Sequence, residues 1–297
     1  MKEYVLLPQP IEQGAVRLLE EAGVVYRVAD SPEVERVKPL MKEARAVVLR
    51  TGLRMTAELM NEAGELLTVS RTGAGYDNVD VEAATGRGVI VTSSIGVNTV
   101  SVAEHTVCLV LALFKQLFLL DRELRGGNFR VRYANHPREA KNKLLGLVGF
   151  GRIGRSVSDR CSRAFGMRVQ VYDPFVPEET RRELSGRVGF VDLDELFRSS
   201  DVISIHVPLT GDTRGLVDGR LLGLMKRGAF LVNTSRGGIV REQDLVEALK
   251  EGRIAGAALD VFEQEPVPPD HELLRLDNVI LTPHAAALTR ECVLEMA

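Results

Sequence analysis

Three residues that suit carbonyl chemistry each follow an apolar run of the sequence. Arg236 comes after "GAFLVNTS", Glu265 after "AGAALDVFEQ" and His284 after "NVILTP". Reduction of a carbonyl by hydride transfer needs a proton donor, a cation that orients the substrate's carboxylate, and a group that keeps the donor protonated. We predict His284 as the acid/base, Arg236 as the substrate clamp and Glu265 as the partner of His284. Taken singly, each is also typical of an ordinary loop or surface residue.

A glycine motif lies between an apolar run and a helical stretch in the middle of the chain. Gly149, Gly151 and Gly154 form the G-x-G-x-x-G of "LLGLVGFGRIGRSV". In a dinucleotide-binding turn the first glycine permits the bend, the second admits the pyrophosphate and the third lets the helix pack closely. Asp173 ends the next strand, where an acid would bind the adenosine ribose and repel a 2′-phosphate, so NAD is predicted rather than NADP. His206, at the end of "DVISIHVP", could line the same site.

Short β-rich runs alternate with helical segments along the chain, which predicts an α/β protein with parallel sheets. The length of 297 residues favours two domains. We expect two Rossmann-like, doubly wound domains with an interdomain cleft: residues 1–98 with 285–297 for the substrate, and residues 99–284 for NAD. Residues 98–127 read as one long helix between cap residues and a Gly-Gly stop.

The composition excludes several classes of partner. A net charge of −3 gives no attraction for nucleic acid or an acidic membrane, so small molecules are expected. The apolar stretch Val107–Leu120 is too short for a membrane span and predicts a buried helix. Cys108, Cys161 and Cys292 lack metal-ligand spacing and are expected to be buried thiols, with no metal site. The N-terminal run is too short for a signal peptide, so a cytoplasmic location is expected.

Five motifs together carry a family resemblance. In this order, "GFGRIG", "YDP", "NTSRGGIV", "GAALDVFEQEP" and "LTPH" resemble the D-isomer-specific 2-hydroxyacid dehydrogenases over roughly residues 65–290. The resemblance implies that Arg236, Glu265 and His284 are catalytic, and that the protein is a homodimer in which the long helical region takes part. It also implies NAD contacts at Arg152, Ile153, Asp173, Val207, Thr234 and Asp260, beside which we place Pro208, Thr213, Ser235 and Ala286 as further candidates.

The substrate is suggested by the stretch "SRTGAGYDNVDVEAATGRGVIV", which resembles the substrate loop of 3-phosphoglycerate dehydrogenases. By this resemblance the amides near Ala74 and Gly75 hold the substrate's carboxylate, Arg50 and Arg71 bind the distal phosphate, and Asn98 contacts the substrate. Two arginines suit an anionic tail because they offer forked, charge-assisted hydrogen bonds. The expected reaction is the NAD-dependent oxidation of 3-phospho-D-glycerate to 3-phosphooxypyruvate in serine biosynthesis.

Two alternatives stay open at this point. One is a hydroxypyruvate or glyoxylate reductase, in which Arg50 and Arg71 are structural; the other is an NAD(H)-sensing, corepressor-like binding protein. The complete set of arginine, glutamate and histidine favours an enzyme.

The sequence also departs from the family pattern in "HAAALT", where alanines follow His284 in place of glycine. It ends at Ala297, inside a helix expected from Leu288. It holds no segment resembling a regulatory C-terminal domain, so serine feedback through one is not expected.

Overall fold

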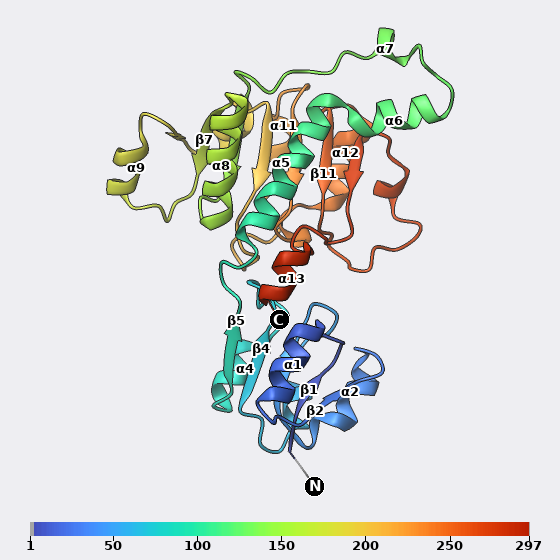
Figure 1. Ribbon diagram of the computed structural model, residues 1–297. Coiled ribbons are helices and arrows are strands. Elements are labelled where there is room, and N and C mark those ends of the chain that lie inside the picture. The colour runs from blue at the N-terminus through green and yellow to red at the C-terminus, as the bar shows by residue number, and fades with distance from the viewer. Residues whose placement is uncertain (1–2, 297) are drawn as a thin grey trace. The chain divides into compact units, whose positions relative to one another are not determined.

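The computed structural model describes residues 3–296 and divides the chain into two compact units (Figure 1). Unit 1 comprises Met1–Asn98 and Ala287–Ala297, and unit 2 comprises Thr99–Ala286. Each unit has a parallel β-sheet with helices, so the predicted fold class is confirmed.

Unit 1 contains a five-stranded sheet in the order β2-β1-β3-β4-β5, with all neighbours parallel. Its strands are β1 (Tyr4–Leu7), β2 (Tyr26–Val28), β3 (Ala44–Leu49), β4 (Thr68–Arg71) and β5 (Ile90–Ser93). Its helices are α1 (Gln13–Glu21), α2 (Val34–Met41), α3 (Ala57–Asn61), α4 (Val81–Gly86) and α13 (Arg290–Met296). Apolar side chains such as Leu6, Val47 and Val69 are fully buried, as expected for parallel strands covered by helices.

Unit 2 contains a seven-stranded parallel sheet in the order β12-β11-β10-β9-β6-β7-β8. Its strands are β6 (Leu144–Val148), β7 (Arg168–Tyr172), β8 (Gly189–Phe190), β9 (Val202–Ile205), β10 (Phe230–Asn233), β11 (Gly256–Leu259) and β12 (Val279–Leu281). Its helices are α5 (Thr99–Lys115), α6 (Leu117–Arg125), α7 (Val131–Ala134), α8 (Arg152–Phe165), α9 (Glu178–Leu184), α10 (Leu193–Ser199), α11 (Gly219–Leu224), α12 (Glu242–Lys250) and the short η1 (Gly237–Ile239) and η2 (Glu272–Arg275).

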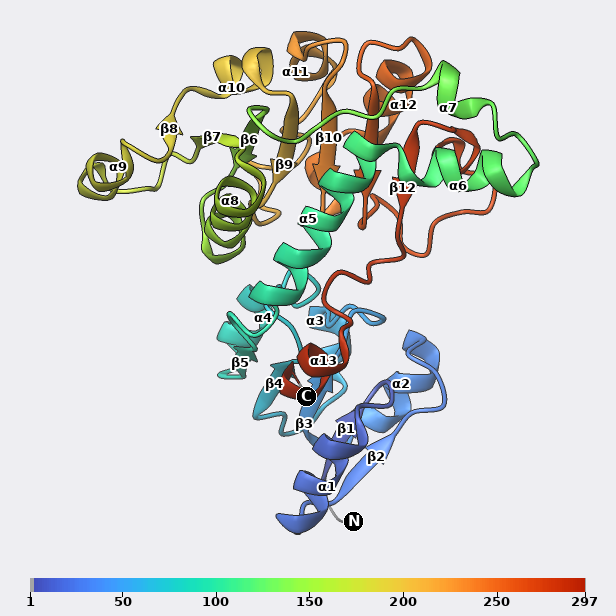
Figure 2. The same cartoon turned by 45° about the horizontal axis from the view of Figure 1, so that its top comes forward.

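Helices α5 and α8 cover one face of the unit 2 sheet, and α10, α11 and α12 cover the other (Figure 2). The strand order reverses between β6 and β9. Open α/β sheets bind ligands at the carboxyl ends of their strands beside such a reversal.

The single helix predicted over residues 98–127 is wrong, because the chain breaks at Gln116. This residue adopts the left-handed conformation (φ 50°, ψ 37°), and α5 and α6 are bent by 60°. Helix α5 packs in the core of unit 2, whereas α6 has no buried residue, so burial ends where the helix breaks. The buried helix predicted for Val107–Leu120 is therefore confirmed only as far as Lys115, since Leu117 and Phe118 are exposed.

Among residues 3–296, no single helix is long and apolar enough to cross a membrane, and α5 and α6 satisfy the length and composition only as a bent pair.

The prediction of three buried cysteines is wrong for one of them. Cys161 and Cys292 are buried, and burial raises the pKa of the Cys161 thiol to about 12. Cys108 is exposed, because it lies one turn after the exposed Glu104 on the outward face of α5.

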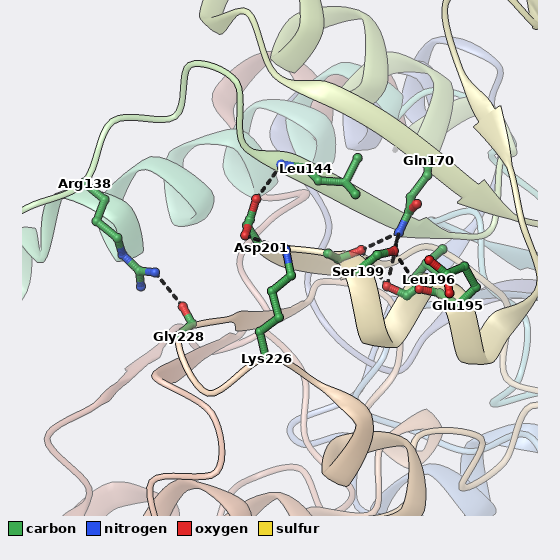
Figure 3. A network of polar contacts seen from close by, with 10 residues as sticks. Arg138, Leu144, Gln170, Glu195, Leu196, Ser199, Asp201, Lys226 and Gly228 are labelled. Atoms are coloured by element: carbon green, nitrogen blue, oxygen red, sulfur yellow. Dashed lines mark hydrogen bonds and ion pairs between the residues drawn. The ribbon is translucent and has the colours of Figure 1, made fainter.

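A polar network fixes the amino ends of the unit 2 strands (Figure 3). Asp201, directly before β9, accepts hydrogen bonds from the Leu144 amide (2.8 Å) and from Lys226 Nζ (2.9 Å). Burial raises the pKa of Asp201, but these two donors and the nearby charge of Lys143 outweigh burial and hold that pKa below its usual range. Nearby, Arg138 donates to the carbonyl oxygen of Gly228 (2.6 Å), two residues before β10. These contacts stabilise the segments at the amino ends of the strands.

Candidate active site

The carboxyl ends of β10, β11 and β12 lie side by side in unit 2. Asn233 pairs with Leu259, and Leu259 pairs with Leu281, so these three strands end at one level. The segments that carry Arg236, Asp260 and His284 leave the sheet directly after these positions. The geometry of the sheet therefore brings together residues that are far apart in the sequence.

His284 and Glu265 form a close polar contact at these strand ends. His284 Nδ1 lies 2.6 Å from Glu265 Oε2, and the other carboxylate oxygen of Glu265 accepts from the Phe262 amide (3.0 Å). The two side chains are about one-third exposed, at 30% and 35%. Because Nδ1 is held by the carboxylate, Nε2 is the ring nitrogen that can exchange a proton with a substrate.

Glu265 is set up to remain ionised. Burial raises the pKa of Glu265, but the hydrogen bond with His284, the charge of that ring, the Phe262 amide and the Arg236 guanidinium together bring the pKa below its ordinary value. An ionised carboxylate at this place orients the imidazole and stabilises its protonated form.

Arg236 is positioned by Asn233, a residue that the sequence analysis did not single out. Asn233 is buried, donates from Nδ2 to the carbonyl oxygen of Arg236 (2.9 Å), and accepts from the amide and the hydroxyl of Ser235. Arg236 itself donates to the carbonyl oxygen of Ser235 (2.8 Å). The sequence signal that could have identified Asn233 is its position as the polar last residue of the otherwise apolar strand β10.

Asp260 holds the backbone around His284. Its fully buried carboxylate accepts hydrogen bonds from the amides of Ala285 (2.8 Å) and Ala286 (2.9 Å) and from the Thr282 hydroxyl (2.5 Å). Its carbonyl oxygen accepts from the His284 amide (2.8 Å), where His284 has a φ of 52°. In this structure Asp260, predicted to contact the cofactor, binds the loop that presents His284.

The glycine turn between β6 and α8 has the geometry of a dinucleotide site. Gly149 has a φ of 97°, and a Cβ there would lie 2.6 Å from the carbonyl oxygen of His206. A Cβ on Gly154 would lie 2.4 Å from the carbonyl oxygen of Gly149, whereas a Cβ on Gly151 would meet nothing within 4 Å. Gly149 and Gly154 therefore have no space for a side chain, whereas Gly151 faces open space. Gly151 directly precedes the 14-residue helix α8. These residues fit NAD, whose pyrophosphate needs this opening and the free amides.

Asp173 lies at the tip of β7, beside the same turn. Its Oδ2 accepts from the Phe150 amide (2.7 Å) and its Oδ1 from the Phe175 amide (2.9 Å). Each carboxylate oxygen retains a lone pair for a ribose hydroxyl. The Phe175 side chain is 90% exposed next to Asp173, and the sequence analysis did not include it.

The remaining predicted cofactor positions have different environments. Burial lowers the pKa of His206 to about 4, so its ring, which contacts the Ser204 hydroxyl, is neutral near pH 7. Thr234 is buried with its hydroxyl 2.9 Å from that of Thr106 on α5, and Thr213 donates to the carbonyl oxygen of Pro208 (2.6 Å). Arg152 and Pro208 are exposed, Ile153, Val207, Thr213 and Ser235 are half-buried, and Ala286 is buried.

Comparison with known proteins agrees with this geometry. Residues 107–286 match the family model described as D-isomer specific 2-hydroxyacid dehydrogenase, NAD binding domain. D-3-phosphoglycerate dehydrogenase of Archaeoglobus fulgidus is 41% identical over 98% of this chain and 55% of its own length. The chain belongs to the D-isomer specific 2-hydroxyacid dehydrogenase family.

Other members of the family carry different names. Glyoxylate reductase of Korarchaeum cryptofilum is 40% identical over 100% of this chain and 90% of its own length. The crystal structure of D-lactate dehydrogenase from Aquifex aeolicus, complexed with NAD and lactic acid, superimposes with a TM-score of 0.89 at 30% identity, covering 99% of this chain and 92% of that one. The chain spans about half the length of the phosphoglycerate dehydrogenases that it matches.

In unit 1 of this family member, Asn78 connects the two arginines predicted to bind phosphate. Arg71 is buried and donates from Nε to Asn78 Oδ1 (3.0 Å), while Asn78 Nδ2 donates to the carbonyl oxygens of Arg50 and Leu53 (2.9 Å each). Arg50 Nη1 lies 3.3 Å from Glu12 Oε1. Both arginines thus belong to the carboxyl ends of the neighbouring strands β3 and β4.

The other predicted substrate residues are also in unit 1. Ala74 and Gly75 are half-buried in the turn after β4, and Asn98 is half-buried at the end of the segment that follows β5. Asn78, which the sequence analysis missed, is the residue that ties this turn to Arg50.

Proposed function

We propose that this protein catalyses the NAD-dependent oxidation of a D-2-hydroxyacid, with 3-phospho-D-glycerate as substrate and 3-phosphooxypyruvate as product, in serine biosynthesis. The observation that carries the chemistry is the 2.6 Å contact between His284 and Glu265 on the same strand edge as Arg236. In this arrangement His284 is a base whose Nε2 is available to the substrate, and Glu265 is the anion that orients its ring. Arg236 is the cation for the substrate's carboxylate.

Each group has a definite task in the oxidation. Arg236 binds the substrate's carboxylate, and His284 Nε2 takes the proton of the hydroxyl group as that group becomes a carbonyl. Glu265 holds the ring and compensates the charge that His284 acquires. The glycine turn at Gly151 and the carboxylate of Asp173 would hold NAD, which would supply the hydride acceptor for this oxidation.

Arg50 and Arg71 support a phosphorylated substrate. They are linked through Asn78 at neighbouring strand ends, and their guanidinium groups offer forked donors that match a phosphate. Three relatives named D-3-phosphoglycerate dehydrogenase share 40% to 42% identity with this chain.

A glyoxylate or hydroxypyruvate reductase is the second candidate, and the contacts of the same arginines favour it. Arg50 already pairs with Glu12 and the carbonyl oxygen of Pro10, and Arg71 is buried against Asn78, as structural arginines are. Two relatives named glyoxylate reductase match 100% of this chain over 90% and 88% of their own length.

NADH formation measured with a panel of 2-hydroxyacids separates the two candidates. We expect a higher kcat/KM with 3-phosphoglycerate than with D-glycerate, D-lactate or glycolate. Arg50→Gln should raise the KM for 3-phosphoglycerate roughly tenfold or more, because it removes one charge-assisted contact with the phosphate. The KM for D-glycerate, which has no phosphate, should not change. Arg54→Gln, an exposed arginine in the same segment, is the control. A preference for an unphosphorylated acid, with no effect of Arg50→Gln, supports the reductase instead.

We also propose a homodimer. Leu117, Phe118, Leu124, Phe129 and Tyr133 on α6, α7 and the turn between them are more than half exposed. Neighbouring apolar side chains of this size are typical of protein interfaces. Light scattering should give twice the mass of the chain, and a charged substitution at Phe118 should shift the mass toward that of one chain.

A further inference from the structure

Two carboxylates outside the site described above lie beside the segment that carries Glu265. Glu263 precedes Glu265 by two residues, and Glu242 is the first residue of α12. The Glu263 amide donates to Glu242 Oε1 (2.6 Å), and the Glu242 amide donates to Glu263 Oε1 (2.9 Å). Each side chain therefore satisfies the backbone of the other residue.

His271 binds the second oxygen of Glu242. Its Nε2 lies 3.0 Å from Glu242 Oε2, and its Nδ1 accepts from the Leu273 amide (3.3 Å). Because Nδ1 is an acceptor, the hydrogen-bond network assigns the ring proton to Nε2, which donates it to Glu242. The Glu242 side chain is only 10% exposed, so water competes little for these bonds.

The bonds between Glu242 and Glu263 place a carboxylate at the positively polarised amino end of α12. The residue before α12, Arg241, provides no side-chain cap, so the carboxylate of Glu263 takes that place at the positive end of the helix. Burial raises the pKa of Glu242, and the neighbouring Glu263 carboxylate adds to this, while the bonds from the Glu263 amide and His271 oppose it. His271 thus compensates a carboxylate that is costly to bury.

Gly237 brings the two active-site segments into direct backbone contact. It directly follows Arg236, and a Cβ on it would lie 1.9 Å from the carbonyl carbon of Phe262 and 2.4 Å from the Glu263 amide nitrogen. Only glycine allows this approach. The segment of Arg236 and the segment of Glu265 are therefore joined at Gly237 and again, a few residues later, at Glu242.

We infer that Glu242, Glu263 and His271 form a clasp that positions Glu265 relative to Arg236 during catalysis. The inference rests on the proposed function, and the three are positioning residues because they act through Glu265. A shift of the Glu265 segment by about 1 Å would weaken its contact with His284 and could cost on the order of 100-fold in turnover.

Kinetics of matched variants test the clasp. Glu242→Ala and Glu263→Ala should each lower kcat by roughly 10- to 100-fold with little change in the KM for NAD. Glu263→Gln keeps an acceptor for the Glu242 amide and should retain most of the kcat. Glu247→Ala, which removes an exposed glutamate from the same helix, is the control and should retain wild-type kcat. Unchanged kcat in both alanine variants overturns the inference.

A second readout does not depend on turnover. The ring-nitrogen NMR shifts of His284 report the tautomer that Glu265 holds, with the proton on Nδ1. We expect the wild type and Glu247→Ala to show this tautomer, and Glu263→Ala to show a mixture while its melting temperature confirms folding. A wild-type tautomer in Glu263→Ala overturns the clasp. If the wild-type protein oxidises no 2-hydroxyacid, the proposed function fails, and the NMR comparison still decides the clasp.

Discussion

Neighbouring glycines of one turn are required for different physical reasons. Gly149 needs a positive φ and contacts the backbone of His206, and Gly154 packs against the carbonyl of Gly149. Gly151 has an ordinary φ of −72° and open space on its Cβ side. The fold therefore requires the outer two glycines, and the middle one is left for the ligand.

This difference predicts separable effects of alanine substitution. Gly149→Ala and Gly154→Ala should each lower the free energy of unfolding by roughly 2–4 kcal/mol, because the backbone must move to admit a methyl group. Gly151→Ala should leave the melting temperature unchanged and weaken NADH binding, since its methyl group lies where the pyrophosphate approaches. Thermal unfolding and NADH fluorescence titration check both effects. Destabilisation by Gly151→Ala, or wild-type NADH affinity in it, would contradict this assignment.

In the sheet of unit 2, structural contacts lie at the amino ends of the strands and the candidate catalytic residues lie at the carboxyl ends. At the amino ends, Asp201 joins the start of β6 to Lys226 before β10. At the carboxyl ends, the polar residues of three strands converge around His284. Substitutions at the first edge are therefore expected to change stability without changing the chemistry.

Asp201→Asn provides a pH-dependent case. The pKa of Asp201 is lowered in the folded protein, so its contribution to stability is complete above its unfolded value near 3.8 and is lost as the pH falls through the lower folded value. Asp201→Asn should cost about 1 kcal/mol near neutral pH, and the difference from wild type should shrink below about pH 4. Urea unfolding at a series of pH values measures this. A difference that stays constant down to pH 3 would show that Asp201 is not the titrating group.

The cysteines test the burial of α5 and α8. In the native protein one thiol, Cys108, should react with a maleimide, because Cys161 and Cys292 are buried and the pKa of Cys161 is raised to about 12. All three should react after unfolding. Mass spectrometry of the labelled peptides gives the answer, and rapid native labelling of Cys161 would contradict the packing of α8.

Sequence patterns predicted the elements and residues whose signals are local. Arg236, Glu265 and His284 follow apolar runs, so their place at one sheet edge could be foreseen. Asn78 and Glu242 were not predicted, because their partners are backbone groups of distant segments. The break at Gln116 was missed because apolar residues continue beyond it, although they are no longer buried.

The two units of the molecule contribute different properties to the proposed enzyme. Unit 2 contains His284, Glu265, Arg236 and the glycine turn, and so determines the type of reaction. Unit 1 contains Arg50 and Arg71, the residues that we propose select the substrate. The relatives of the chain carry names with different substrates, D-3-phosphoglycerate dehydrogenase and glyoxylate reductase among them.

The most direct test of the proposed chemistry is the kcat of His284→Gln, measured together with NADH binding. Glutamine can hydrogen-bond to Glu265 but cannot take up the substrate's proton. We expect kcat to fall by roughly 10²- to 10⁴-fold, the usual contribution of a general base, while NADH affinity stays at the wild-type level. An unchanged kcat in this variant would contradict the role of His284 and with it the proposed reaction.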